Sequence, residues 1–433
     1  MTSASFDQEA YRQGFYQALQ DRSLAFPKDQ ALYEPFYADD ELTPVDPIRD
    51  LFQAVLLGGT QGAYLFSGFR GTGKSTELAR LAELLRAAGR PVLAIDIQDY
   101  LNLSAPIDLS DFLIVVGGAV SDQAEVLLGV DPARQSYWDR MVAFLTRTEV
   151  DFREISFKAG AELKLALRQD PSIQFRIQSF LKGHIGTLVA DLRDFVQDVA
   201  DQLAARHEGI RPVVIFDSFE KFRGTSLNAV QVEAAVENLF IGHADKLRFV
   251  GTHCIYSVPP WLPIRMGGLP SAFARLAMLP CLKVREPDGT PCQAGLDAVE
   301  KLVRRRGDWT LLLGERRRLD QLALASGGHI QHLFQMLRGC LLRARTLPIK
   351  DRAVELEVSE FRNGFQALSV EDARWLSAIA KTRRVMLPDN VALSTLARFF
   401  DTHLVLCYRN GELWYDAHPM VRAWAIELAG PPV

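Results

Sequence analysis

Gly68-Phe69-Arg70-Gly71-Thr72-Gly73-Lys74-Ser75 is the stretch around which the rest of the chain is arranged. An apolar run precedes it at 63–66, and a helical pattern follows it at 76–85. The order strand, glycine-rich turn, helix, with the spacing G-x-x-x-x-G-K-S, is typical of a phosphate-binding loop. The glycines let the backbone curl so that successive N–H groups face one phosphate, and the start of the helix adds partial positive charge.

The loop supplies side chains with distinct expected roles. Lys74 offers a mobile positive charge to the β- and γ-phosphates of a nucleotide, and the Ser75 hydroxyl is placed to ligate Mg²⁺. The alternative is a glycine-rich loop whose site has decayed, and the second motif argues against it. The residues expected to bind the nucleotide are Gly68, Arg70, Gly71, Thr72, Gly73, Lys74, Ser75 and Thr76.

The second motif lies at 212–221, where an apolar strand ends in Asp217. Ligands of parallel sheets bind at the carboxyl ends of the strands, so Asp217 and the phosphate loop are expected to converge. The Asp217 carboxylate is the expected second protein ligand of Mg²⁺. Glu220 is the candidate to orient or deprotonate the attacking water; a structural pair with Lys221 or an arginine is the alternative.

Two later segments add catalytic candidates. A strand is predicted at 247–252, and Thr252 and His253 at its end are placed to sense the γ-phosphate or to hold the water. A satisfied loop histidine is the alternative for His253. A last strand is predicted at 277–284, and Arg275 before it, or Arg265 upstream, is a candidate finger toward a neighbouring subunit's nucleotide. A plain surface arginine is the alternative for both.

Bulk composition limits the class of protein. The chain has 433 residues, 48% hydrophobic and 24% charged, which is typical of a globular protein of two or three domains. A net charge of −4 argues against a protein that coats nucleic acid, although a local basic patch remains compatible with it. The five cysteines form no C-x-x-C pair, which suits reduced thiols. With no signal peptide and no long apolar run, the expected location is cytoplasmic, without a membrane segment.

The pattern along the chain predicts four parts. They are an N-terminal segment at 1–45, an ATPase-like core at 46–290, a helical lid at 291–348 and a winged-helix domain at 349–433. Inside the core, 130–172 reads as an insertion with a small hairpin at 152–167, and the apolar period of 173–206 predicts one long helix, with Gly183 and Gly186 as candidate points of interruption. That helix is either a partner surface or ordinary packing along the sheet. Helices followed by an Asn410-Gly411 hairpin signal predict the winged helix.

Over most of 45–425 the chain resembles the AAA+ superfamily, and within it the STAND-type signalling ATPases and the origin-recognition initiator ATPases. The resemblance rests on the phosphate loop and its continuation to Leu78, on 217–221, on Gly327-Gly328-His329 and on 415–419. It implies a three-layer α/β core with a parallel sheet, a helical lid, a C-terminal winged helix, ATP and Mg²⁺, and a nucleotide-controlled switch.

The sequence departs from this family in two places. The family's lid helix often carries an arginine soon after the Gly-Gly turn, where this chain has Ile330-Gln331-His332, and Arg338 lies further along. The second carboxylate, Glu220, is not adjacent to Asp217. The second departure predicts slow rather than fast ATP hydrolysis.

Two functions from different classes follow. The first is an ATP-binding regulatory switch that engages a protein partner through its lid and winged helix, in bacterial stress or phage defence, with a nucleotide-dependent homo-oligomer as a further expectation. The alternative is a DNA-binding initiator or loader. The predicted helix at 391–400 holds one basic residue, Arg398, whereas a DNA-reading helix usually needs several; Lys381, Arg383 and Arg384 form a nearby basic cluster. A small-molecule kinase would need an acceptor pocket that no motif marks.

Overall fold

The computed structural model of the chain describes residues 7–38, 42, 44–129, 137–148, 160–225, 227–365, 368–385 and 393–430. They fall into two compact units. The sheet unit comprises Ile48–Ser67 and Arg80–Met278, and the C-terminal unit comprises Met1–Pro47, Gly68–Ala79 and Leu279–Val433. Within the described ranges, no helix has the length and apolar character needed to cross a membrane.

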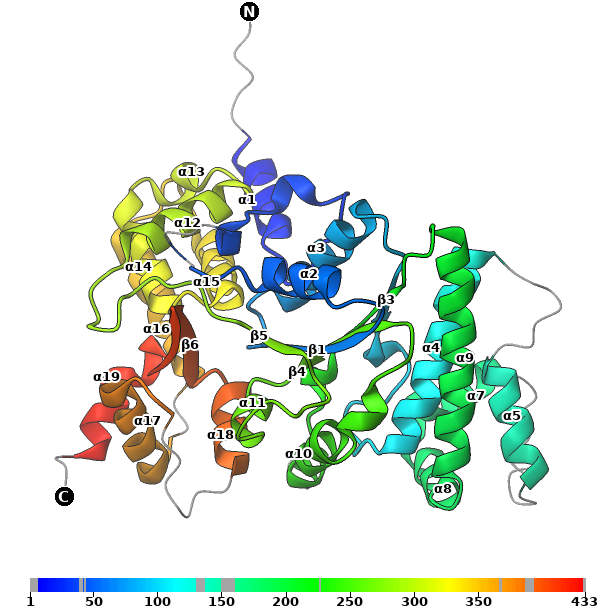
Figure 1. The fold of residues 1–433 in the computed structure, drawn as a ribbon. Coiled ribbons are helices and arrows are strands. Elements are labelled where there is room, and N and C mark those ends of the chain that lie inside the picture. Colours follow the sequence, from blue (N-terminus) through cyan, green and yellow to red (C-terminus); the bar gives the residue numbers. More distant parts are fainter. Residues whose placement is uncertain are drawn as a thin grey trace, which may run out of the picture. The chain divides into compact units, whose positions relative to one another are not determined.

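The sheet unit is built on five strands in the order β2-β3-β4-β1-β5 (Figure 1). The pairs β2–β3, β3–β4 and β4–β1 are all parallel. Every residue of β1 is buried, as expected for a strand covered on both faces. The predicted α/β fold with a parallel sheet is therefore confirmed. The strands are β1 Gly62–Gly68, β2 Val92–Asp96, β3 Val213–Asp217, β4 His253–Val258 and β5 Arg275–Leu279.

Helices fill the connections between these strands. The helix predicted after β2 is present as α4, and it begins at a capping box in which Asp108 and Asp111 satisfy each other's backbone N–H groups. In Figure 1, α2 lies on one side of the sheet and α10 on the other. The helices of this part are α2 Pro47–Leu57, α3 Lys74–Ala87, α4 Leu109–Leu128, α5 Tyr137–Thr148, α9 Ile185–Arg206, α10 Ala229–Glu237 and α11 Leu262–Arg265.

The insertion differs from its prediction. The second arm of the predicted hairpin is the helix α7, Gly160–Gln169, and the first arm, 152–157, lies outside the described residues. Leu163 and Leu167 are fully buried whereas Leu165 is 52% exposed, so the period is four residues and helical rather than two. The single long helix predicted at 173–206 is two helices, α8 Pro171–Leu181 and α9, separated by a turn that contains Gly183.

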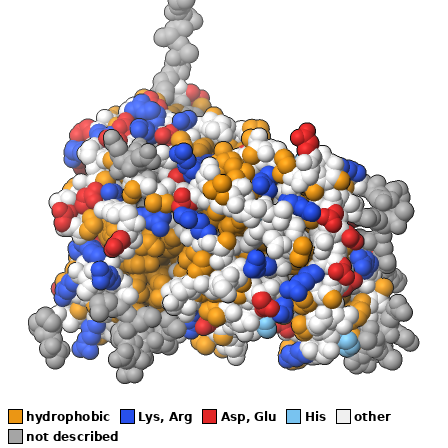
Figure 2. Space-filling view, in the orientation of Figure 1, with side chains coloured by type: hydrophobic (Ala, Val, Ile, Leu, Met, Phe, Trp, Pro, Cys, Tyr) orange, Lys and Arg blue, Asp and Glu red, His pale blue; other side chains and the backbone are white. Residues whose placement is uncertain are grey.

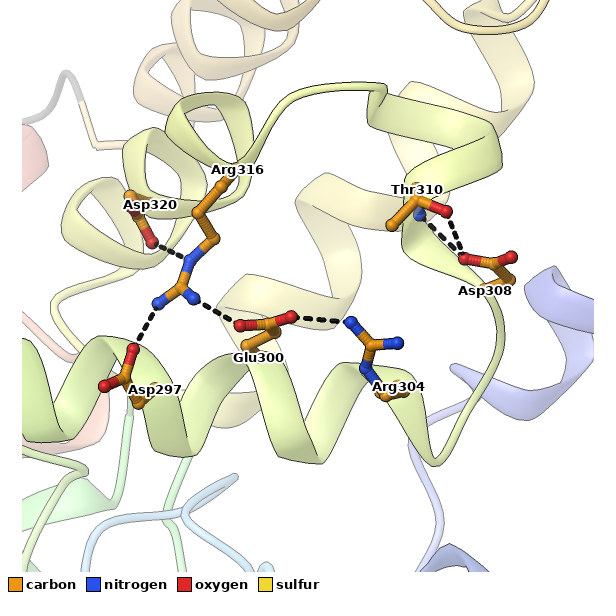
Figure 3. A network of polar contacts seen from close by, with 7 residues as sticks. All are labelled: Asp297, Glu300, Arg304, Asp308, Thr310, Arg316 and Asp320. Atoms are coloured by element: carbon orange, nitrogen blue, oxygen red, sulfur yellow. Dashed lines mark hydrogen bonds and ion pairs between the residues drawn. The ribbon is translucent and has the colours of Figure 1, made fainter.

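The C-terminal unit begins with α1, Gln8–Ala18, and contains the helices predicted as a lid. α12 and α14 are joined by a network in which the Arg316 guanidinium, at the start of α14, contacts Asp297 and Glu300 of α12 and Asp320 of α14 (Figure 3). α15 begins directly after the Gly327-Gly328 turn, with His329 as its N-cap. These helices are α12 Gln293–Arg304, α13 Trp309–Leu313, α14 Arg316–Ser326 and α15 Ile330–Arg343.

The last part of the chain has the order that the sequence predicts: helices, a hairpin and a closing helix. β6 and β7 pair antiparallel, and Gly411 makes the turn at a φ of 80°, where a side chain would be strained. Cys281, in the segment after β5, packs against this hairpin in a buried cluster. The elements are α16 Asp351–Asn363, α17 Val370–Thr382, α18 Leu393–Asp401, β6 Val405–Asn410, β7 Glu412–Ala417 and α19 Pro419–Ala429.

Candidate nucleotide-binding site

The phosphate-binding motif folds as strand, tight loop and helix. β1 ends at Gly68 and α3 begins at Lys74. Gly71 and Gly73 have φ values of 77° and 96°, which a side chain would disfavour, so these two glycines are needed for the backbone path. The local structure is the one that the sequence predicts, and it places the amino end of a 14-residue helix directly behind the loop.

The donors of this loop suit an anionic ligand. The Lys74 side chain is 4% exposed, and its ammonium donates a hydrogen bond of 2.8 Å to the carbonyl oxygen of Phe69. The Thr72 hydroxyl donates to the same carbonyl at 2.7 Å. A phosphate would offer the buried ammonium a charged acceptor, which forms a shorter and stronger hydrogen bond than a carbonyl does. The donor chemistry of the loop therefore fits the phosphates of a nucleotide.

Two histidines hold the outer side of the loop. Nε2 of His329, the N-cap of α15, lies 2.6 Å from the carbonyl oxygen of Arg70. Nε2 of His403, in the turn between α18 and β6, lies 3.1 Å from the same oxygen. His403 has a φ of 58°, an uncommon conformation for a residue with a side chain. One backbone carbonyl of the loop is thus shared by residues from two separate elements.

The carbonyls of Gly71 and Thr72 also have polar neighbours from outside the loop. The backbone N–H of Gln331 donates to the carbonyl of Gly71 at 3.2 Å. The Tyr37 hydroxyl, from the N-terminal segment, lies 3.4 Å from the carbonyl of Thr72 and donates to Pro280 at 2.7 Å. A Cβ on Gly71 would come within 2.3 Å of the Gln331 side chain, so close approach as well as φ requires glycine there. Gln331 and both histidines carried no site assignment in the sequence, whereas Tyr37 was a candidate to lie over the nucleotide base.

Hydrogen bonds fix which nitrogen of these imidazoles carries the proton. Nδ1 of His329 accepts the N–H of His332 at 3.3 Å, so Nε2 must be the donor to Arg70. Nδ1 of His418 accepts the N–H of Met420 at 3.1 Å, so Nε2 of His418 is the donor to Nδ1 of His332, also at 3.1 Å. Burial favours the neutral ring: it lowers the pKa of His329 to about 4 and that of His418 to about 3.

The same histidines are close enough to be considered for a metal. Ring nitrogens of His329, His332 and His403 lie within 4.8 Å of one another. A metal needs the lone pair of each ligating nitrogen, whereas Nε2 of His329 carries the proton that is donated to Arg70. In this arrangement the cluster acts through hydrogen bonds, and metal binding would require His329 to give up either that bond or its cap on α15.

Asp217 ends β3 at the same edge of the sheet at which β1 ends. Phe216 lies opposite Tyr256, and Ser67 lies opposite Val258, so both strands finish level with the end of β4. The residue after Asp217, Ser218, has a φ of 78°, and its N–H donates to the Asp217 carboxylate at 2.7 Å. This sharp turn ends the strand and lets the carboxylate lie at the edge where parallel sheets bind ligands.

Glu220 is buried, and its partner is a residue that the sequence analysis missed. The Ser257 hydroxyl donates to Oε2 of Glu220 at 2.7 Å and accepts the N–H of Phe219 at 3.3 Å. Ser257 is the penultimate residue of β4. The signal for it was present, a polar side chain near the end of an apolar run, but the strand had been predicted six residues too early.

The assignment of Thr252 and His253 is wrong. β4 begins at His253, which lies opposite Gly62 at the start of β1, so both candidates are at the amino edge of the sheet. His253 is buried there between the Tyr64 hydroxyl and the carbonyl of Gly59, each at 3.2 Å, and burial lowers its pKa to about 4. His253 is therefore a buried histidine whose ring nitrogens both have hydrogen-bond partners, which was the alternative to a catalytic role. The strand predicted at 247–252 is absent because 248–252 is a loop with a turn at 250–251, where Gly251 has a φ of 70°.

The candidate finger arginines both have partners within the sheet unit. Arg275 begins β5 and pairs with Asp50 at 2.5 Å, with 49% of its side chain exposed. Arg265 pairs with Glu237 at 2.8 Å and is more buried. In the C-terminal unit, the Arg338 guanidinium lies over the ring of Tyr16 at 5.7 Å. A finger role for Arg275 stays a prediction.

Comparison with known proteins finds likeness in solved structures. No protein-family model and no curated protein matches the chain. It is similar to the structure of the Aeropyrum pernix ORC2 protein in ADPNP and ADP complexes, with 13% identity and a TM-score of 0.42 over 95% of this chain and 96% of that one. It is also similar to Cdc6p from Pyrobaculum aerophilum, with 14% identity and a TM-score of 0.38 over 93% and 97%.

A third similar structure is Drosophila ORC bound to poly(dA/dT) DNA and Cdc6, with 12% identity and a TM-score of 0.35. The match covers 93% of this chain and 54% of that one. All three TM-scores are below 0.5, so the assignment of the site rests on the residues described above.

Proposed function

We propose that this chain binds ATP with Mg²⁺ in its phosphate loop and hydrolyses it slowly, as a nucleotide-controlled switch. The observation that carries the proposal is the loop itself, which joins glycines at positive φ, a buried lysine and the start of a long helix. Together these features gather N–H donors and positive charge in one turn, which favours an anionic ligand.

Each site residue has a proposed part in holding the nucleotide. Lys74 and the N–H groups of the loop would bind the phosphates, and Ser75 and Asp217 would hold Mg²⁺. Mg²⁺, when bound, neutralises phosphate charge. Glu220 would orient or accept a proton from the attacking water, and the hydrogen bond from Ser257 fixes its carboxylate.

The test of the proposed function separates binding from turnover. Lys74→Ala is expected to weaken ATP binding by about a hundredfold or more, because a buried charge-assisted contact is lost. Asp217→Asn and Glu220→Gln are expected to retain ATP binding and to slow ATP hydrolysis by about tenfold or more. Calorimetric titration and phosphate release measure the two effects. Arg86→Ala removes the same charge from the far end of α3 and serves as the control. Unchanged affinity in Lys74→Ala would place the nucleotide elsewhere.

The partner of the switch has two candidate classes. The sequence left a DNA-binding initiator or loader as the alternative to a protein-engaging switch, and the solved structures above carry names of the initiator kind. Basic side chains beside the hairpin are already engaged: Arg398 pairs with Asp372 at 2.5 Å, and Arg383 pairs with Asp416. On the face drawn in Figure 2, basic and acidic side chains are interspersed rather than gathered by sign.

Duplex binding across a salt series, with and without ATP, decides between the two classes. Each phosphate contact adds about −0.9 to the slope of log affinity against log salt. A slope steeper than about −3, with binding retained at physiological salt, would make DNA the partner. A shallow slope would leave the lid and winged helix as a surface for a protein. In both cases the nucleotide site is the same.

A further inference from the structure

The unusual feature of the phosphate loop is what holds its carbonyl oxygens. Two consecutive carbonyls, those of Arg70 and Gly71, accept hydrogen bonds from the lid and from the turn after α18, and the Tyr37 hydroxyl of the N-terminal segment lies 3.4 Å from the next carbonyl, that of Thr72. The carbonyl of Arg70 is held most firmly, by His329 at 2.6 Å and His403 at 3.1 Å. All of these residues belong to the C-terminal unit.

A hydrogen bond that fixes a backbone carbonyl oxygen also fixes the direction of the N–H group in the same peptide plane. The peptide bond is planar and trans, so the C=O of Arg70 and the N–H of Gly71 point in opposite directions from the same rigid plane. Fixing the oxygen against two imidazoles therefore turns the N–H of Gly71 away from them, toward the inner side of the loop. The hydrogen bond from the N–H of Gln331 to the carbonyl of Gly71 does the same for the N–H group of Thr72. These are the donors that a phosphate-binding loop uses.

The two histidines contact the carbonyl of Arg70 with the same ring nitrogen. Both use Nε2, and the tautomer of His329 is fixed because its Nδ1 caps α15. His403 reaches Arg70 from a left-handed backbone conformation, which is unfavourable for a residue with a Cβ. Glycine would adopt that φ without cost, so the turn alone does not explain a histidine at this position.

We propose that His329 and His403 are positioning residues for the nucleotide: they set the Arg70–Gly71 peptide so that the loop presents its N–H groups to phosphate. The inference rests on the proposed function for the identity of the ligand. It adds that the lid and the hairpin turn act on nucleotide affinity through backbone, without touching the nucleotide. Movement of either element away from Arg70 lowers affinity, and bound phosphate in turn favours the arrangement in which both histidines contact it.

The test uses variants that remove the contact and keep the fold. His329→Asn retains a side chain that caps helices well and cannot reach Arg70. His403→Gly removes the ring and relieves the backbone conformation, so stability should stay level or rise. Each variant is expected to weaken ATP binding about tenfold, as loss of a supporting contact typically does. His403→Gln places an amide donor near the position of Nε2 and is expected to restore much of the affinity.

Amide hydrogen exchange without nucleotide is the second readout, and it is independent of ATP. Faster exchange at 71–73 in His329→Asn and His403→Gly, with wild-type thermal stability, is the expected result. If the exchange changes but the wild type binds no ATP, the proposed function fails and the positioning role stands. If exchange and ATP affinity both stay at wild-type values in the two variants, the positioning role is overturned. Failure of His403→Gln to restore affinity would reduce His403 to a packing role.

Discussion

At the scale of single residues, Asp111 is the most informative buried group outside the candidate site. Its Oδ2 accepts hydrogen bonds from Gln174 and Gln178 at 2.8 and 2.5 Å, whereas its Oδ1 and the Oε1 of Gln174 are buried without a partner among the described residues. A proton on Asp111 would turn one of two unpaired acceptors into a donor. Burial, with the charge of Asp108, raises the pKa of Asp111 to about 7.

A raised pKa makes the stability contribution of Asp111 fall as pH rises. The unfolded chain releases this proton near pH 4 and the folded protein near pH 7, so between them the folded state holds more protons. The free energy of unfolding should then drop by up to about 1.4 kcal/mol per pH unit in that window and level off above it. Asp111→Asn should abolish this dependence, because its amide supplies the donor at every pH.

The measurement is the difference in urea unfolding between wild type and Asp111→Asn from pH 5 to pH 8. The difference is needed because buried His329 and His418, with lowered pKa values, titrate in the opposite sense: they add stability as pH rises through the unfolded value near 6.5. A difference curve that stays flat from pH 5 to pH 8 would mean that Asp111 is ionised in the folded protein.

For single residues, the sequence predicted local motifs better than it predicted where a side chain lies in the fold. The loop at 68–75 and the strand ending in Asp217 are local patterns, in which a few adjacent residues determine the backbone, and both fold as expected. Thr252 and His253 failed because a buried histidine at a strand start cannot be told from a polar strand end by its neighbours alone. The roles of His329 and His403 depend on contacts across hundreds of residues, which no local pattern carries.

At the scale of elements, the lid is stabilised by the charged network between α12 and α14 (Figure 3). Arg316 contacts Asp297 at 2.9 Å, Asp320 at 2.7 Å and also Glu300. Arg316→Met keeps the aliphatic stem and removes the charge, so we expect a loss of about 1 kcal/mol in the free energy of unfolding at low salt. The loss should shrink by half or more at about 0.5 M NaCl, because salt screens partly exposed pairs.

Arg304 is the matched control for that prediction. Among the described residues its ion pair is with Glu300, at 2.7 Å, its guanidinium lies over the Trp309 ring at 6.0 Å, and 61% of its side chain is exposed. Urea unfolding of Arg304→Met should therefore stay within about 0.5 kcal/mol of wild type at both salt concentrations. Equal losses in the two variants would show that the network does not act as a unit.

The sequence-based prediction of the fold was accurate for some elements and wrong for others. Helices with clear caps were found close to their true bounds, since caps are local: α4 and α17 both begin at capping boxes. α7 was taken for half a hairpin because Leu163, Leu165 and Leu167 fit period two as well as part of a helical face, and only burial separates the two. The break between α8 and α9 falls at Lys182–His184, at Gly183, one of the two glycines that the sequence marked as candidate interruptions.

At the scale of the whole molecule, the prediction concerns assembly. Arg275 and Asp50 form an ion pair whose side chains are 49% and 33% exposed, so it contributes at most about 1 kcal/mol. Exchanging Asp50 for a phosphate held by a neighbouring copy is therefore cheap for Arg275. We expect Glu220→Gln, which retains ATP, to form a stable oligomer with ATP and Mg²⁺, and wild type to return to the 48.4 kDa monomer as ATP is consumed.

Light scattering on a size-exclusion column measures that difference in mass. Arg275→Ala in the Glu220→Gln background should bind ATP with unchanged affinity and remain at 48.4 kDa, because the contact to the neighbouring copy is lost and the exposed pair with Asp50 contributes little. Asp50→Asn, which releases Arg275 from its partner, should assemble at a lower protein concentration than the parent. If the protein stays monomeric under every condition, ATP would act on the lid and hairpin of one chain and not on assembly. Arg275 would then be an ordinary surface arginine.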